Sequence, residues 1–216
     1  MPRASLQPDL VSLPPVGLSF ATGVDILADG DHSLWSDWQS LLLREPAEGE
    51  QLREDLGLDK PYSDPICRDG KRYGAFLAEL AVRGLIEFVP LSDATSGFFS
   101  VAKREGKQRL IIDTRIANTY FRDPPHTDLP GCASFSRIEL GSDDVFYLAE
   151  ADVDNAFHRV LLPPGLGRYF ILPSVHARYV SLNFAGAWPR NRENGLVHSC
   201  GSCRRAGVGV STFADN

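Results

Sequence analysis

Hydrophobic positions recur with a helical period over residues 72–88. The positions that share one face are Phe76, Leu77, Leu80, Ala81 and Leu85. This spacing predicts an amphipathic helix with its apolar side on a core. Gly84 near its end and Pro90 beyond it are typical stop signals.

Two runs with strand character follow, at residues 98–102 and 109–113. Residues 103–107 connect them, and Gly106 supplies a turn, so the pattern predicts a hairpin with a charged tip. Further along the chain, Pro-rich connectors separate three more runs that predict strands. These runs are residues 145–151, 168–172 and 178–182.

The two ends of the chain have a different pattern from its middle. Residues 1–65 are rich in Pro, Gly and acids, and we expect a loosely structured acidic arm with short helices near residues 34–43 and 48–56. From about residue 186 the periodicity disappears, which predicts an irregular tail over 186–216. The sequence therefore predicts an α+β fold with its ordered part at 66–185.

Length and composition suit an ordinary globular protein, with 216 residues, 43% of them hydrophobic and 23% charged. Such a chain is long enough to bury a core. No run of about eighteen apolar residues occurs, so we expect no membrane span. The N-terminus has no secretion pattern, so we expect an intracellular protein, in the nucleus or the cytoplasm.

The net charge of −6 argues at first against a nucleic-acid partner. The charge is unevenly distributed, because residues 23–65 hold eleven acids and three bases and the rest of the chain is positive. Residues 101–123 hold six bases against three acids. A basic patch beside an acidic forepart is compatible with a nucleic-acid channel.

The four cysteines leave two interpretations. His198, Cys200 and Cys203 could donate three zinc ligands, but no second ligand pair with suitable spacing follows. Free intracellular thiols are the simpler interpretation.

Residues 152–157 read D-V-D-N-A-F and follow an apolar run. A strand that ends in a carboxylate presents it at a sheet edge, where oxygen ligands can hold Mg²⁺. Asp152 and the backbone carbonyl of Val153 would form half of a two-metal site for nucleotidyl transfer. Alternatively, Asp152 caps a helix that begins at Val153.

The predicted hairpin carries cations suited to a triphosphate. Arg109 can offer two parallel N–H donors to phosphate oxygens, and Lys103 can act as a point charge. Alternatively, the tip is charged only because it is solvated.

Together these two stretches resemble the reverse transcriptase family. Residues 98–118, F-F-S-V-A-K-R-E-G-K-Q-R-L-I-I-D-T-R-I-A-N, are similar to the family's fingers signature, V-x-K-K-x-x-G-K-x-R followed by D-x-R-x-x-N. Residues 152–157 are similar to its first palm motif, D-x-x-D-A-[FY]. The segments around Pro124 and Arg168 resemble retroelement polymerases of dinoflagellate-type genomes. The resemblance covers roughly residues 70–185.

The resemblance implies a fingers hairpin, a partial right-hand palm and a role for each matching residue. Asp152 would be the catalytic metal ligand, with Val153 lending its carbonyl to two Mg²⁺ ions. The dNTP would be bound by Lys103, Arg109, Asn155 and Phe157. Phe157 would also exclude a ribose 2′-hydroxyl, or it is simply a core aromatic. Template and fingers contacts would fall to Asp113, Arg115 and Asn118.

The sequence also departs from the family. Asn155 stands where the family has a second Asp, and neither the next palm motif nor the Y-x-D-D turn is found. One hypothesis is a frame shift, because degenerate codons for residues 202–216 can spell L-P-T-G-W-G-W-G-L-H-F-C-R-Q in another frame. The 216 residues would then be a fragment of a retroelement's RNA-directed DNA polymerase.

With one of three expected aspartates, this chain should be inactive. The intact enzyme would extend a primer on an RNA or DNA template from dNTPs. Two other interpretations remain: a non-catalytic nucleic-acid-binding remnant, and a structural α/β domain with an accidental likeness. The sequence leaves the oligomeric state open.

Overall fold

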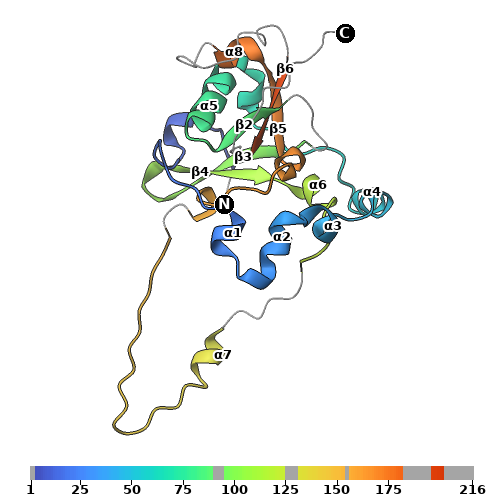
Figure 1. Cartoon of the computed structure of the whole chain (residues 1–216). Helices are drawn as coiled ribbons and strands as arrows, with labels where there is room; N and C mark the ends of the chain where they lie inside the picture. Colours follow the sequence, from blue (N-terminus) through green and yellow to red (C-terminus); the bar gives the residue numbers. More distant parts are fainter. Residues whose placement is uncertain (1–2, 90–94, 125–130, 154–155, 182–195, 202–216) are drawn as a thin grey trace.

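The computed structural model describes residues 3–89, 95–124, 131–153, 156–181 and 196–201, and shows a mixed helix and strand protein (Figure 1). The strands are β1 (Arg3–Ala4), β2 (Ile86–Val89), β3 (Gly97–Ala102), β4 (Gln108–Asp113), β5 (Ile171–His176) and β6 (Leu196–Gly201). The α-helices are α1 (Gly23–Ile26), α2 (His32–Ser36), α3 (Trp38–Leu42), α4 (Pro46–Asp55), α5 (Gly70–Val82), α6 (Arg115–Asn118), α7 (Cys132–Phe135) and α8 (Ala177–Ser181). The α+β class expected from the sequence is therefore confirmed.

Two small antiparallel sheets form the strand layer. One has the order β1-β3-β4 and the other the order β2-β6-β5. β6 pairs with β2 on one side and with β5 on the other. The tail was expected to be irregular from residue 186, and this was wrong for residues 196–201, because a strand can be specified by partners on both sides rather than by its own periodicity.

Helix α5 forms where the helical pattern was predicted, but it ends earlier. The expected helix ran to residue 88, whereas α5 stops at Val82 and residues 86–89 form β2. Gly84 has a φ of 70°, a left-handed conformation that glycine adopts without steric cost. The N–H of Gly84 donates to the carbonyl of Ala81, and that of Leu85 to Leu80, at 2.9 and 3.0 Å. This pair of bonds is a Schellman motif, which ends the helix.

The core lies between α5 and the strands. Tyr73, Phe76 and Leu77 on α5 are buried, and Phe98 of β3 packs on them. The rings of Tyr73 and Phe98 are stacked, with their centroids 5.7 Å apart. Val180 of α8 closes the same cluster. The hairpin is thus anchored on α5 through its buried face.

The sequence predicted that residues 1–65 are loosely structured, but residues 3–12 pack closely against the core and the hairpin. Leu6 is 1% exposed and belongs to the core, and β1 pairs with β3. The buried side chain of Gln108 accepts from the N–H of Gln7 at 2.8 Å and donates to the carbonyl of Ser5 at 3.0 Å. Residues 3–12 gain these contacts from β3 and β4, which lie about a hundred positions later in the chain.

The short helices of the acidic forepart occur near their predicted places. Residues 34–43 were expected to form one helix, and the structure has α2 and α3 separated at Asp37. The expected helix at 48–56 is α4. Trp38 joins this region to the rest, because its Nε1–H donates to the carbonyl of Pro164 at 3.2 Å and its ring meets Tyr169 edge-on.

The three later strands differ most from expectation. The run at 168–172 is shifted, since β5 begins at Ile171 and a short 3₁₀ helix, Leu166–Tyr169, precedes it. Residues 177–181 form helix α8 instead of a strand. Residues 145–151 form no strand. They lie in an arm, residues 131–153, that extends away from the body (Figure 1).

The arm lacks a strand because a strand requires backbone partners, and no described segment pairs with it. Its hydrophobic side chains are exposed, with Tyr147 at 86% and Leu148 at 74%. Within the residues that the structure describes, no helix has the length and apolarity to cross a membrane.

Candidate functional site

The hairpin β3–β4 is the best-formed part of the predicted site. Its strands pair in register from Gly97 with Asp113 to Ala102 with Gln108. The N–H of Lys103 donates to the carbonyl of Lys107 at 2.8 Å and closes the turn. The side chains of Lys103, Lys107 and Arg109 are all exposed. The hairpin therefore presents three described cations at and beside its tip.

The two faces of the hairpin have different environments. Directly paired residues point to the same side, so Phe98, Ser100 and Gln108 share a buried face. The opposite face, which we call the outer face, carries Phe99, Val101, Arg109, Ile111 and Asp113. Its apolar residues Phe99, Val101 and Ile111 are only half-buried. Arg109, Ile111 and Asp113 occupy every second position of β4. Arg109 and Asp113 therefore lie on the same face.

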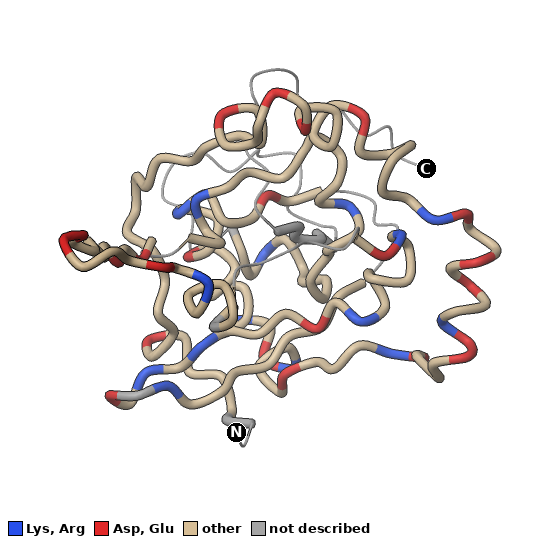
Figure 2. Tube along the Cα trace, turned by 90° about the horizontal axis from the view of Figure 1, so that it is seen from below, with Lys and Arg blue, Asp and Glu red and all other residues tan. Residues whose placement is uncertain are grey.

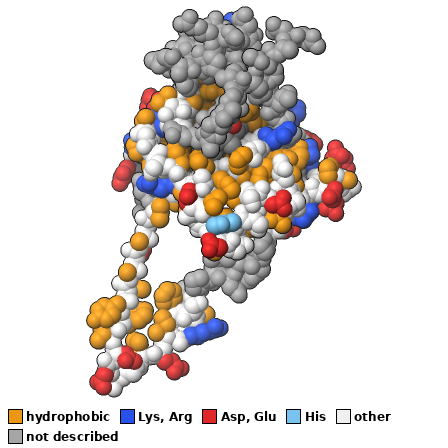
Figure 3. Space-filling view, in the orientation of Figure 1, with side chains coloured by type: hydrophobic (Ala, Val, Ile, Leu, Met, Phe, Trp, Pro, Cys, Tyr) orange, Lys and Arg blue, Asp and Glu red, His pale blue; other side chains and the backbone are white. Residues whose placement is uncertain are grey.

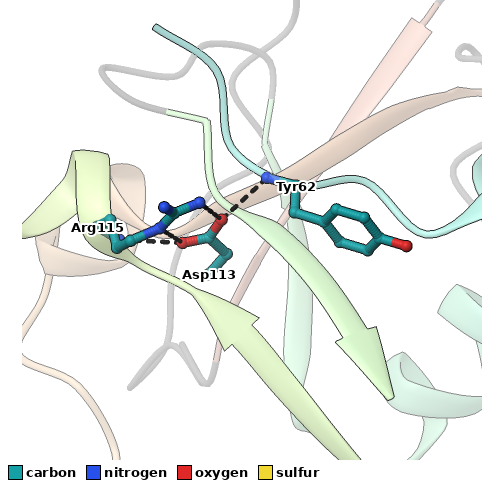
Figure 4. Close-up of polar contacts among 3 residues, drawn as sticks. All are labelled: Tyr62, Asp113 and Arg115. Carbon is teal, nitrogen blue, oxygen red and sulfur yellow. Dashed lines mark hydrogen bonds and ion pairs between the residues drawn. The ribbon is translucent and has the colours of Figure 1, made fainter. Parts of the chain in front are cut away.

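Asp113 forms the most ordered polar contact of this surface, with Arg115 and Tyr62 (Figure 4). Arg115 donates from Nε to Oδ1 and from Nη2 to Oδ2, both at 2.8 Å. The N–H of Tyr62 donates to Oδ2 at 2.9 Å. Asp113 is 6% exposed, whereas the side chain of Arg115 is 60% exposed. A buried carboxylate thus holds a solvent-facing guanidinium in one orientation.

These contacts shift the pKa of both partners. The hydrogen bonds from Arg115 are the main reason why the pKa of Asp113 lies well below its usual range, and they outweigh the burial that would raise it. The N–H of Tyr62 lowers it further. The hydrogen bonds to Asp113 also raise the pKa of Arg115. Both groups are therefore charged at neutral pH.

Replacing Asp113 with asparagine is expected to reduce the free energy of unfolding by about 2 kcal/mol at pH 7. The neutral amide keeps only one acceptor oxygen, so one hydrogen bond from Arg115 loses its acceptor and the other loses its charge assistance. The native carboxyl has a lowered pKa, so its contribution is complete above about pH 4, the unfolded pKa, and declines as the pH falls toward the native one. Urea unfolding at pH 7 and pH 3 measures this difference. Asp59→Asn, at an exposed position, is the control. If wild type were more stable than the Asp113 variant by the same free energy at both pH values, the lowered pKa of Asp113 would be contradicted.

The residues of the predicted metal site are not assembled. Asp152 is exposed and makes no hydrogen bond or ion pair with any residue that the structure describes. The carbonyl of Val153 accepts from the N–H of Ala156 at 3.2 Å. Phe157 is 97% exposed and so does not line a nucleotide pocket here. Asn155 lies outside the described residues.

The described residues therefore do not form a magnesium site. Among the residues whose side chains the structure describes, which exclude 196–201, no group of three or more His, Cys, Asp or Glu could hold a metal ion. A lone exposed carboxylate binds Mg²⁺ poorly, because the ion prefers several oxygen ligands in octahedral geometry. The alternative helix cap at Asp152 is also not formed, since residues 151–153 are irregular.

The structure brings Asp113 and Arg115 together and places Lys103 and Arg109 on the same hairpin. Asn118 is exposed at the end of α6. No hydrogen bond or ion pair among the described residues joins Asp152 to Lys103 or Arg109. Residues 202–216, which include Cys203 and the possible frame-shifted motif, lie outside the described residues.

Two residues that hold the hairpin in place, Tyr62 on the outer face and Gln108 on the buried face, were missed from the sequence. Tyr62 supplies a backbone donor to Asp113, and its ring packs edge-on against Phe99 with centroids 5.8 Å apart. Gln108 holds the N-terminal segment against the hairpin. Nothing in the sequence around Gln108 signalled its burial, and a backbone donor such as the N–H of Tyr62 has no sequence signature.

Comparison with known proteins adds no relative. No protein-family model matches the chain, and no curated protein or solved structure matches it significantly.

Proposed function

We propose that this chain is a fingers segment of a reverse transcriptase that binds nucleic acid and nucleotide phosphates but does not catalyse nucleotidyl transfer by itself. The observation that carries the proposal is the hairpin, in which the residues of the signature occupy one short, paired element. Lys103 lies at its turn, Arg109 lies near the start of β4, and Asp113 orients Arg115 at its base.

The chemistry of this surface suits phosphate. An arginine held by a buried carboxylate loses little conformational entropy when it binds phosphate, because its guanidinium is already oriented. Arg109 and Lys103 are exposed and can approach a phosphodiester or a triphosphate from the tip. Each cation that meets a phosphate releases condensed counterions from the nucleic acid, so binding depends on salt.

No step is assigned to a metal ion, because the described carboxylates do not form a binding site for one. Asp152 is exposed on the arm, and no group of three or more His, Cys, Asp or Glu among the described residues could hold a metal ion. Nucleotidyl transfer by two metals needs further carboxylates beside it. A longer polymerase that supplies them would use Mg²⁺ and dNTPs on a primer–template, as the resemblance implies.

Changing Arg109 to glutamine is expected to weaken binding of the purified chain to a labelled primer–template. It should also reduce the slope of log K against log salt concentration by about one, because one phosphate contact is lost. Fluorescence anisotropy across a salt series measures both quantities. Arg68→Gln is the matched control, since Arg68 is also an exposed arginine but lies outside the hairpin. Equal affinity and equal slope in wild type and the Arg109 variant would rule out this role.

Two alternatives give different outcomes in the same experiments. A non-catalytic remnant retained for binding would show the Arg109 effect and no primer extension, and only a longer form that extends primers would separate it from a polymerase segment. A structural domain with an accidental likeness would show no salt-dependent binding. Primer extension by the purified 216-residue chain would overturn the proposed inactivity.

A further inference from the structure

The arm, residues 131–153, exposes more apolar surface than a segment in water retains without a partner. Its exposed large hydrophobic residues are Phe135, Ile138, Leu140, Val145, Phe146, Tyr147, Leu148 and Val153. Figure 3 shows these side chains gathered below the body. Four of them, at 145–148, are consecutive, so both sides of an extended chain are apolar there.

Acidic residues bracket this apolar run. Asp143 and Asp144 precede it, and Glu150 and Asp152 follow it. Over the whole arm there are five acids and a single base, Arg137. A surface that covers the run should therefore be apolar in its middle and basic at its margins.

The outer face of the hairpin has this character. Phe99, Val101 and Ile111 form a half-buried apolar strip. Arg109 lies on the same face, directly opposite Val101, and Lys103 and Lys107 flank the turn. Figure 2 shows how the basic residues (blue) and the acidic residues (red) are distributed along the trace. The two surfaces are complementary in both polarity and charge.

We propose that two copies of this chain associate by exchanging arms, with residues 145–148 of each copy lying on the outer face of the other copy's hairpin. A second copy fits because each chain offers one arm and one outer face, which is the condition for a closed two-fold dimer. In the structure the arm extends away from its own body (Figure 1). Beyond the two sides of the arm, the chain is joined to the body by the bridges Leu43–Phe121 and Ala21–Val160. The inference concerns self-association and does not depend on the proposed function.

The test is sedimentation of the purified chain without nucleic acid across the micromolar range. Leu148→Asp on the arm and Arg109→Glu on the outer face should each raise the dimer dissociation constant at least about ten-fold, since each places an unfavourable charge in the contact. Val16→Asp and Arg68→Glu are the matched controls at exposed positions outside both surfaces. Circular dichroism checks that all four variants fold.

Mixing the two disruptive variants gives the sharper result. The Leu148→Asp chain retains its outer face and the Arg109→Glu chain retains its arm, so a mixed dimer keeps one of the two contacts. The mixture should therefore associate more tightly than either variant alone. No recovery on mixing, or equal association of the variants and wild type, would overturn the proposal. So would a wild-type monomer whose arm is protected from protease, because the arm would then be covered by its own chain.

Discussion

Replacing Phe98 with alanine is expected to lower the free energy of unfolding by about 3–5 kcal/mol, the range for a buried Phe truncated to Ala. Phe98 is 0% exposed and contacts two aromatic rings of α5, with centroid distances of 5.7 Å to Tyr73 and 6.4 Å to Phe76. The substitution removes these contacts and leaves a cavity, because α5 and β3 cannot close the space completely. Urea unfolding followed by circular dichroism measures the change.

Phe157→Ala is the control for this prediction. Phe157 is the same residue type but is 97% exposed, so its removal should change stability by no more than about 0.5 kcal/mol. The pair therefore separates a core aromatic from a surface one. A similar loss in both variants would mean that Phe157 is buried in solution. An effect below about 1 kcal/mol for Phe98→Ala would contradict the anchoring of the hairpin on α5.

Replacing Gly97 with alanine is expected to cost about 3 kcal/mol, at the upper end for an overpacked site. An added Cβ would lie 1.7 Å from the carbonyl oxygen of Tyr62 and 2.6 Å from its carbonyl carbon. Both are backbone atoms, so relief requires residues 61–63 to move away from β3. That movement would also withdraw the N–H of Tyr62 from Asp113.

The Gly97→Ala substitution should also change the pKa of Asp113. Loss of the Tyr62 donor should raise the pKa of Asp113 toward its ordinary value, so the Gly97→Ala variant should lose stability at a higher pH than wild type. Urea unfolding over a pH series measures both effects. Gly30→Ala is the control, because nothing lies within 4 Å of a Cβ at that position. Equal stability of the Gly97 and Gly30 variants would contradict the close approach of Tyr62 to β3.

The hairpin could be predicted from the sequence because its determinants are local. The runs at 98–102 and 109–113 are rich in Phe, Val and Ile, which favour strands, and the turn between them contains Gly106, which has a φ of 70°. The beginning of α5 was predictable for the same reason, since one helical face is apolar throughout. Its end required one more fact, that Gly84 begins a Schellman motif and that the apolar residues after it enter a sheet.

The candidate site was predictable only where its residues are close in the chain. Asp113 and Arg115 are two positions apart, so one short segment brings them together. Asp152 and Arg109 are 43 positions apart, and their meeting depends on how residues 131–153 pack. The arm in this structure extends away instead, and Asp152 stays exposed. A motif therefore identifies residue types and order, but it does not supply the packing that assembles a site.

The sequence by itself determined the hairpin, its charged tip, most of α5 and the acidic short helices, because turns, caps and hydrophobic periods act between near neighbours. The tertiary structure decided which hairpin face is buried, where residues 3–12 pack, and that residues 177–181 form α8 and not a strand. It also decided that β6 forms and that residues 145–151 do not form a strand. The physical reason is the same in each case: a strand or a buried face exists only when a distant segment supplies its hydrogen bonds and its apolar contacts.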